Sequence, residues 1–148
     1  MKAKPISALI ALSLLTFSLV AFAQQPATVG ELLDKGGKKL TKDELAKLVT
    51  GATMSGISPI NPSWKSQTTF KGDGSYSGIV VRAGAGVGTS GIFGKWSLND
   101  QGLMCTDGAN SSNQRIQNCN FFFRLGTAYY MGPTDDRTAQ LLEREIKR

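Results

Sequence analysis

The sequence predicts a mainly β fold, a small antiparallel meander that rolls into a barrel or sandwich of about six to seven strands. Two observations support this prediction. Over residues 52–131, polar and apolar side chains alternate with a period of two in several short runs. Short turns and loops, many of them rich in Gly, Asp and Asn, separate most of these runs. Short strands joined in this way are typical of antiparallel barrels and sandwiches.

Residues 1–23 have the pattern of a secretory signal peptide. Two lysines near the start precede an apolar run over residues 6–22, which ends in a small-residue site before Gln24. An uncleaved membrane anchor is the alternative, because the run is only slightly shorter than a membrane span. Cleavage leaves a chain of single-domain length with no further transmembrane segment. We therefore expect a periplasmic or secreted protein.

The chain that follows begins with helical rather than strand patterns. We expect an unstructured leader over residues 24–30 and a helical segment over 31–51. A Gly-Gly pair at 36–37 divides this segment into two short helices, because two glycines cost about 2 kcal/mol in a helix interior. Thr41 and Glu44 have the spacing of a capping box at the start of the second helix.

The β-domain is expected over residues 52–148. Its alternating runs are ATMSGIS (52–58), WKSQTTFK (64–71), SYSGIVVR (75–82), IFGKWSL (92–98), LMCT (103–106), CNFFFRL (119–125) and AYYM (128–131). Aromatic residues at alternating strand positions are expected to build the core: Trp64, Phe70, Trp96, Phe121 and Phe123. Phe122 must face the side opposite to its two neighbours.

A final helix is expected over residues 134–148. Two aspartates lie near its start and Lys147 and Arg148 at its end, as the helix dipole favours. Ala139, Leu142 and Ile146 form a narrow apolar stripe. The helix is expected to plug or flank the barrel; a protruding partner-binding helix is the alternative.

Cys105 and Cys119 are the only two cysteines of the chain. An exported protein meets an oxidising compartment, so we expect them to form a structural disulfide. A redox-active pair would need close C-x-x-C spacing, which is absent.

A glycine-rich stretch contains the pattern GxGxxG at Gly86, Gly88 and Gly91. A phosphate-binding loop needs the amides of a helix N-terminus, whereas residues 92–98 alternate like a strand. We therefore interpret residues 83–91 as a long flexible hairpin connection and expect no bound nucleotide.

The residue composition leaves little for catalysis. The chain has no histidine, which excludes Ser-His-Asp and Cys-His nucleophile systems and removes the commonest metal ligand. Several aspartates fall in predicted turns, where side-chain to backbone bonding explains them. The net charge of +6 is only mildly basic. We expect no enzyme activity, no cofactor, no metal and no nucleic-acid partner.

A contact surface is the remaining candidate site. The basic residues of the helical segment form either a solvated helix face or a patch for an anionic surface. Phe122, with one of the two neighbouring tyrosines, is expected either to form an exposed apolar patch or to lie under a helix. The candidate contact residues are Lys38, Lys39, Lys42, Phe122, Tyr129 and Tyr130.

The order of motifs resembles a family of small exported proteobacterial β-domains of unknown function. These motifs are LTKDELAKLVTGATMSG, FKGDGSYSG, GKWSLNDQGLMC, a second cysteine and YYM, which together cover about Leu40 to Met131. The resemblance implies a periplasmic or secreted β-domain and no catalytic residues.

The leading hypothesis is a non-enzymatic binding or structural protein of the bacterial cell envelope, whose partner is an unknown protein or envelope component. One alternative is a surface attachment factor that contacts a host or extracellular matrix. Another is a carrier of a small ligand in the barrel, which predicts an apolar internal cavity. A core packed solid by Trp64, Trp96 and the phenylalanines would exclude this last alternative.

Overall fold

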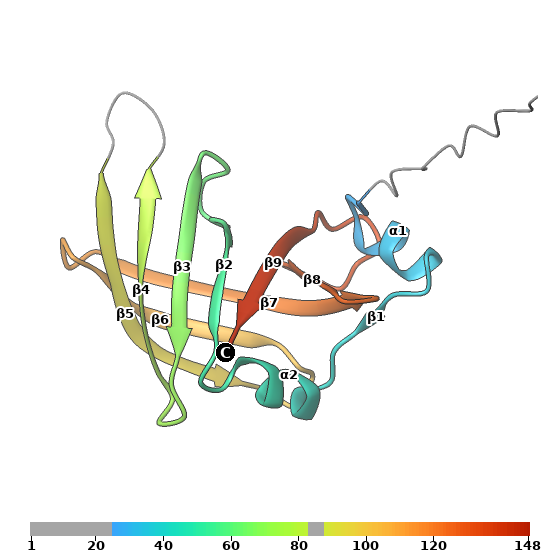
Figure 1. Ribbon diagram of the computed structural model, residues 1–148, viewed down its shortest axis with the longest axis horizontal. Coiled ribbons are helices and arrows are strands. Elements are labelled where there is room, and N and C mark those ends of the chain that lie inside the picture. The colour runs from blue at the N-terminus through green and yellow to red at the C-terminus, as the bar shows by residue number, and fades with distance from the viewer. Residues whose placement is uncertain (1–24, 83–87) are drawn as a thin grey trace, which may run out of the picture.

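Eight strands of the protein form a closed antiparallel barrel (Figure 1). The structure is a computed structural model that describes residues 25–82 and 88–148; the predicted signal peptide lies outside these residues. The barrel strands are β2 (Thr53–Ile57), β3 (Trp64–Phe70), β4 (Ser75–Arg82), β5 (Thr89–Leu98), β6 (Met104–Asn110), β7 (Arg115–Leu125), β8 (Ala128–Gly132) and β9 (Leu142–Lys147). Each strand pairs with the next along the chain, and β9 pairs with β2 to close the ring. Of the predicted barrel or sandwich, the structure has the barrel. Strands β2 to β8 correspond to the seven predicted runs, but the eight barrel strands and β1 exceed the expected number of about six to seven.

The predicted C-terminal helix is wrong, because residues 142–147 form strand β9. Arg144 lies opposite Tyr129 of β8, and Ile146 lies opposite Met54 of β2. Without this strand, β2 and β8 would each present an unpaired edge of backbone groups. Closing the barrel satisfies both edges and outweighs the weak helical pattern of the segment.

The predicted leader over residues 24–30 is also wrong from Gln25 onward. The amide of Val29 donates to the carbonyl of Ala139 at 3.0 Å, and Thr28 forms a bridge with Gln140. Thr28 then caps helix α1 (Val29–Asp34) by accepting from the amide of Glu31. This segment belongs to the fold because its backbone pairs with the chain just before β9.

The predicted helical segment holds two helices with a short strand between them. Gly36, at a φ of +83°, follows α1, and β1 (Lys38–Lys39) then pairs with β7 outside the ring of barrel strands. Helix α2 (Lys42–Val49) begins with the predicted capping box of Thr41 and Glu44. Figure 1 shows α2 at the end of the barrel where the β3–β4 turn lies.

Two apolar clusters lie on opposite faces of the barrel wall. The inner cluster joins α2 to the barrel interior and contains Leu40, Leu45, Val49, Met54, Phe70, Tyr76, Met104, Phe122 and Met131. The outer cluster lies between α1 and the outside of the wall and contains Val29, Leu32, Phe121, Phe123 and Tyr130. Strand β7 therefore buries both of its faces near residue 122.

The aromatic core prediction holds for the phenylalanines and only partly for the tryptophans. Phe70, Phe121 and Phe123 are buried. Trp96 is half-buried, lies edge-on to Phe70 with ring centroids 6.0 Å apart, and packs against the inner cluster. Trp64 is half-buried outside both clusters, under the guanidinium of Arg82.

Strands β5 to β7 test two predictions, one about the pairing of the cysteines and one about the glycine-rich connection. Cys105 and Cys119 lie directly opposite each other on β6 and β7 and form the predicted disulfide, with their Cα atoms 4.1 Å apart. The predicted connection over residues 83–91 is shorter than expected, because β5 begins at Thr89. Gly91 lies in that strand, so no helix follows the glycine pattern to bind a phosphate.

Candidate functional site

The predicted apolar contact patch does not exist. Phe122 is 2% exposed inside the barrel, and Tyr130 is 4% exposed in the outer cluster. Tyr129 is half-buried against the inner cluster. The alternation of β7 was predicted correctly, but α1 covers the outer face, so neither face of the FFF run reaches solvent.

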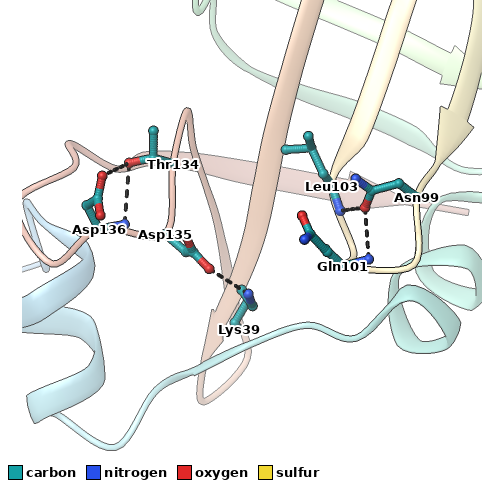
Figure 2. Close-up of polar contacts among 7 residues, drawn as sticks. All are labelled: Lys39, Asn99, Gln101, Leu103, Thr134, Asp135 and Asp136. Carbon is teal, nitrogen blue, oxygen red and sulfur yellow. Dashed lines mark hydrogen bonds and ion pairs between the residues drawn. The ribbon is translucent and has the colours of Figure 1, made fainter.

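The predicted basic contact residues are each paired with a carboxylate. Lys38 forms an ion pair with Glu44 of the capping box. Lys39 reaches Asp135 at 2.7 Å, as Figure 2 shows, and Lys42 reaches Asp100 at 2.7 Å.

These pairs connect the helical segment to two turns of the barrel. The turn before Lys39's partner is held by Thr134, whose hydroxyl accepts from the amide of Asp136 (Figure 2). In the β5–β6 turn, the side-chain oxygen of Asn99 accepts from the amides of Gln101 and Leu103 at 3.0 and 2.9 Å. Lys39 and Lys42 thus bind the chain's own turns, and Lys38 binds the first turn of α2, so each of the three charges is paired within the protein.

A groove of about 1000 Å³ lies on the outside of the wall formed by β2, β3, β4, β8 and β9. Exposed apolar side chains of Ile57, Ile79 and Val81 line it. Because these residues alternate with inward-facing ones, the period-two pattern contained the signal for this outer face. A few exposed apolar side chains are common on folded proteins.

A second cavity, of about 100 Å³, lies inside the barrel. Every one of the eight barrel strands contributes to its lining. At one end it is bounded by Phe70, Tyr76 and Phe122, which pack in the same cluster as the buried side chains of α2. At the other end it reaches the surface beside Ile60, which is 56% exposed in the β2–β3 loop.

Glycines help to shape this interior. Gly94 and Gly108 lie opposite each other on β5 and β6. A Cβ on Gly94 would overlap the backbone of Asp107 and Gly108, and a Cβ on Gly108 would lie 2.6 Å from the hydroxyl of Tyr76. The two glycines let the strands approach closely and leave room for the Tyr76 side chain inside the barrel.

The lining is mainly apolar and contains a small set of polar side chains. They come from β3, β6, β7, β9 and the β2–β3 loop, and they are Ser58, Ser66, Thr68, Thr106, Asn118, Asn120 and Arg144. This combination of an apolar wall and a few polar groups is typical of sites for small molecules.

Arg144 is the one charged side chain among the lining residues, and it is only 4% exposed. Its Nε donates to the sulfur of Met131, and its Nη1 donates to the carbonyl of Glu143 at 3.2 Å. Its Nη2 is buried and has no hydrogen-bond partner within the described chain. Burial lowers the pKa of Arg144 well below its ordinary value, to about 10.

No carboxylate within residues 25–82 and 88–148 pairs with Arg144. The two glutamates beside it in β9 are exposed on the outside of the barrel. Glu143 accepts from the side chain of Gln25 at 2.7 Å, and Glu145 pairs with Lys147 at 2.7 Å. The positive charge of Arg144 is therefore buried without a compensating negative charge.

At Arg144, strand β9 changes the strand with which it pairs. Residues 142–144 of β9 pair with β8, whereas residues 145–147 pair with β2. The side chain of Arg144 borders both the internal cavity and the outer groove. Gly56 of β2 lies beside it, and a Cβ there would overlap Nη1 of Arg144. The absence of a side chain at position 56 thus makes room for the guanidinium in the wall.

Sequence reasoning did not identify Arg144, because the segment was predicted to be a helix with charged residues on its exposed face. A period-two pattern, with Leu142, Arg144 and Ile146 on one face of a strand, was the available signal.

No family model, curated protein or solved structure matches this chain. The resemblance to small exported β-domains therefore stays a prediction, and the geometry of the barrel carries the functional argument. Among the residues described, no cluster of three or more metal-ligating side chains occurs. Within the same residues, no helix has the length and apolarity needed to span a membrane.

Proposed function

We propose that the protein is an exported binding protein that holds a small, mainly apolar ligand inside its barrel. The observation that carries the proposal is the internal cavity of about 100 Å³, to which all eight strands contribute. For comparison, an apolar cavity of about 150 Å³ binds benzene in another protein. The tryptophans are absent from the lining of this cavity, so they do not pack the barrel solid.

Export to the periplasm or the exterior is part of the proposal. It is supported by the signal-peptide pattern of residues 1–23 and by the pair of Cys105 and Cys119. Structural disulfides persist in oxidising compartments and are rare in the cytosol.

Binding without turnover is the form of the proposal that the lining supports. Its polar groups are hydroxyls, carboxamides and one guanidinium. None of these is an ordinary general base near neutral pH. A surface attachment role loses its support, since the aromatic residues on which it depended are buried or half-buried and the lysines are paired.

A matched pair of variants on β4 tests the proposal. Val80 is buried and lines the cavity, whereas Val81 faces outward into the groove. We expect benzene and butan-1-ol to raise the melting temperature of the exported protein and of Val81→Phe, because a ligand that binds only the native state stabilises it. Val80→Phe fills the cavity and is expected to remove the shift.

The proposal is wrong if neither compound stabilises the wild-type protein, or if Val80→Phe retains the full effect. Loss of the effect in Val81→Phe alone would place the ligand in the outer groove and would also contradict the proposal.

A further inference from the structure

We infer that the barrel binds a small monocarboxylate, whose carboxylate group is held by the guanidinium of Arg144. This inference rests on the proposed function, because it names the chemical class of the ligand in the same cavity.

The positive charge of Arg144 is uncompensated. Arg144 is almost completely buried, and no acidic side chain of the described residues pairs with it. Burying a charge is expensive unless it is paired and hydrogen-bonded. A barrel that only needed a stable wall would be better served by an apolar side chain at this position. A ligand anion would supply the missing partner.

Arg144 still has hydrogen-bond donors without a partner among the described residues. A guanidinium carries five N–H donors in a planar fork. Nε and one hydrogen of Nη1 are used by Met131 and Glu143, while Nη2 has no partner. The donors that remain lie on Nη1 and Nη2, the two terminal nitrogens, which together match the two oxygens of a carboxylate.

The single guanidinium of Arg144 also limits the charge of the ligand. Arg144 contributes a single positive charge, and among the described residues no other cation lines the cavity. The surrounding side chains include Met54, Met131 and Phe122. A monoanion is neutralised by one guanidinium, whereas a dianion such as a phosphate monoester would leave a negative charge in this apolar environment.

The volume of the cavity limits the size of the ligand. By proportion to the cavity that binds benzene, about 100 Å³ accommodates roughly four non-hydrogen atoms, close to the five of propanoate. This matches a carboxylate with a short hydrocarbon chain. Such a chain would contact the apolar wall, while the carboxylate faces Arg144 on β9.

The test compares acids with the alcohols of equal chain length. Propanoate, butanoate, propan-1-ol and butan-1-ol are titrated into the ¹⁵N-labelled exported protein and followed by amide chemical shifts, which suit weak binding. We expect butanoate to bind at least tenfold more tightly than butan-1-ol, because a hydrogen bond between charged groups is worth more than one between neutral groups. The largest shifts should include the amides of Gly56, Met131 and Arg144.

The variants are Arg144→Met and, as a control, Arg124→Met. Arg124 is an exposed arginine on β7, so its replacement removes the same charge from the protein without touching the cavity. Arg144→Met is expected to lose the binding of butanoate and to keep that of butan-1-ol, because an unpaired carboxylate is costly to bury, and Arg124→Met is expected to retain the preference for the acid. The preference of the wild-type protein should also disappear below about pH 4, where the ligand is protonated.

The possible results separate the two proposals. If the alcohols bind the wild-type protein and the acids bind no better, the inference about Arg144 is wrong and the ligand cavity stands. If acids bind but Arg144→Met keeps the preference, the anion site lies elsewhere and the inference is again wrong. Tighter binding of inorganic phosphate than of butanoate would overturn the assignment of a carboxylate. If neither acids nor alcohols bind, the proposed function itself fails.

Discussion

Replacing Arg144 by methionine is expected to make the ligand-free barrel more stable. Methionine is unbranched and adapts to irregular space, so it can fill much of the volume of the arginine chain beside Met131. The substitution removes a positive charge that is 4% exposed and has no acidic partner among the described residues. Replacing buried ionic groups by apolar residues of similar volume is often neutral or stabilising.

The magnitude follows from the pKa of Arg144. Burial lowers this pKa to about 10, more than two pH units below its ordinary value, and each pH unit corresponds to about 1.4 kcal/mol. The charged form is therefore destabilised by about 3 kcal/mol in the folded protein at neutral pH. The substitution also removes the hydrogen bonds to Met131 and Glu143, each worth about 1 kcal/mol. We expect a net gain of about 1 to 2 kcal/mol in the free energy of unfolding.

Equilibrium urea unfolding, followed by tryptophan fluorescence with the disulfide intact, measures this difference. The protein must first be freed of bound small molecules by partial unfolding and dialysis. Arg124→Met is the control, since replacing an exposed arginine usually changes the free energy of unfolding by less than about 0.5 kcal/mol. A loss of 1 kcal/mol or more in Arg144→Met would refute the reasoning, because it would mean that the native fold compensates the charge.

Adding ligand should reverse the order of stability. A saturating carboxylate stabilises only the protein that binds it, so the wild-type protein should gain stability with butanoate and Arg144→Met should not.

Three further predictions concern other parts of the barrel. Replacing both Cys105 and Cys119 by serine should lower the free energy of unfolding by about 3 kcal/mol, and the reduced wild-type protein should match the variant in urea unfolding. Gly56→Ala should destabilise the protein by about 1 to 3 kcal/mol, since its methyl group would overlap Nη1 of Arg144. A double-mutant cycle with Arg144→Met should show that the two effects on the free energy of unfolding are coupled. Additive effects would contradict the contact. The hydrogen bond from Lys38 lowers the pKa of Glu44 from 4.5 to about 2, so the ionised form favours folding above pH 4.5 and this contribution is lost as the pH falls to 2. Glu44→Gln should show a smaller loss of stability than the wild-type protein over that range, and identical pH profiles would argue against the pair.

The sequence predicted most of the barrel because its local signals were strong. Strand alternation and turn residues located β2 to β8, and the capping box located α2. In the last segment, Leu142 and Ile146 suit a helix of period 3.6 and a strand of period two equally well. An arginine between them hid the strand pattern, and only the need of β2 and β8 for a partner decides the conformation. That need depends on residues far away in the sequence.

The site was missed for a related physical reason. Contact residues were expected on exposed surfaces, and Phe122 and Tyr130 were among them because one face of an antiparallel strand commonly meets solvent. Phe122 instead faces the barrel interior, and α1 covers the outer face on which Tyr130 lies. The charged residue that matters is the one that the fold buries, and its burial becomes visible only when β9 enters the wall.

The pairing of β2 with β9 also determines when the barrel can close during folding. Ser55 and Glu145, which face each other across this pair, are 90 residues apart. No ring can form until β9 is free to pair with both β2 and β8. Assembly must then proceed by a late, long-range encounter that costs loop-closure entropy before it is rewarded. A tag or truncation that impedes β9 should therefore lower the yield of folded protein more than an equal change in the segment before α1.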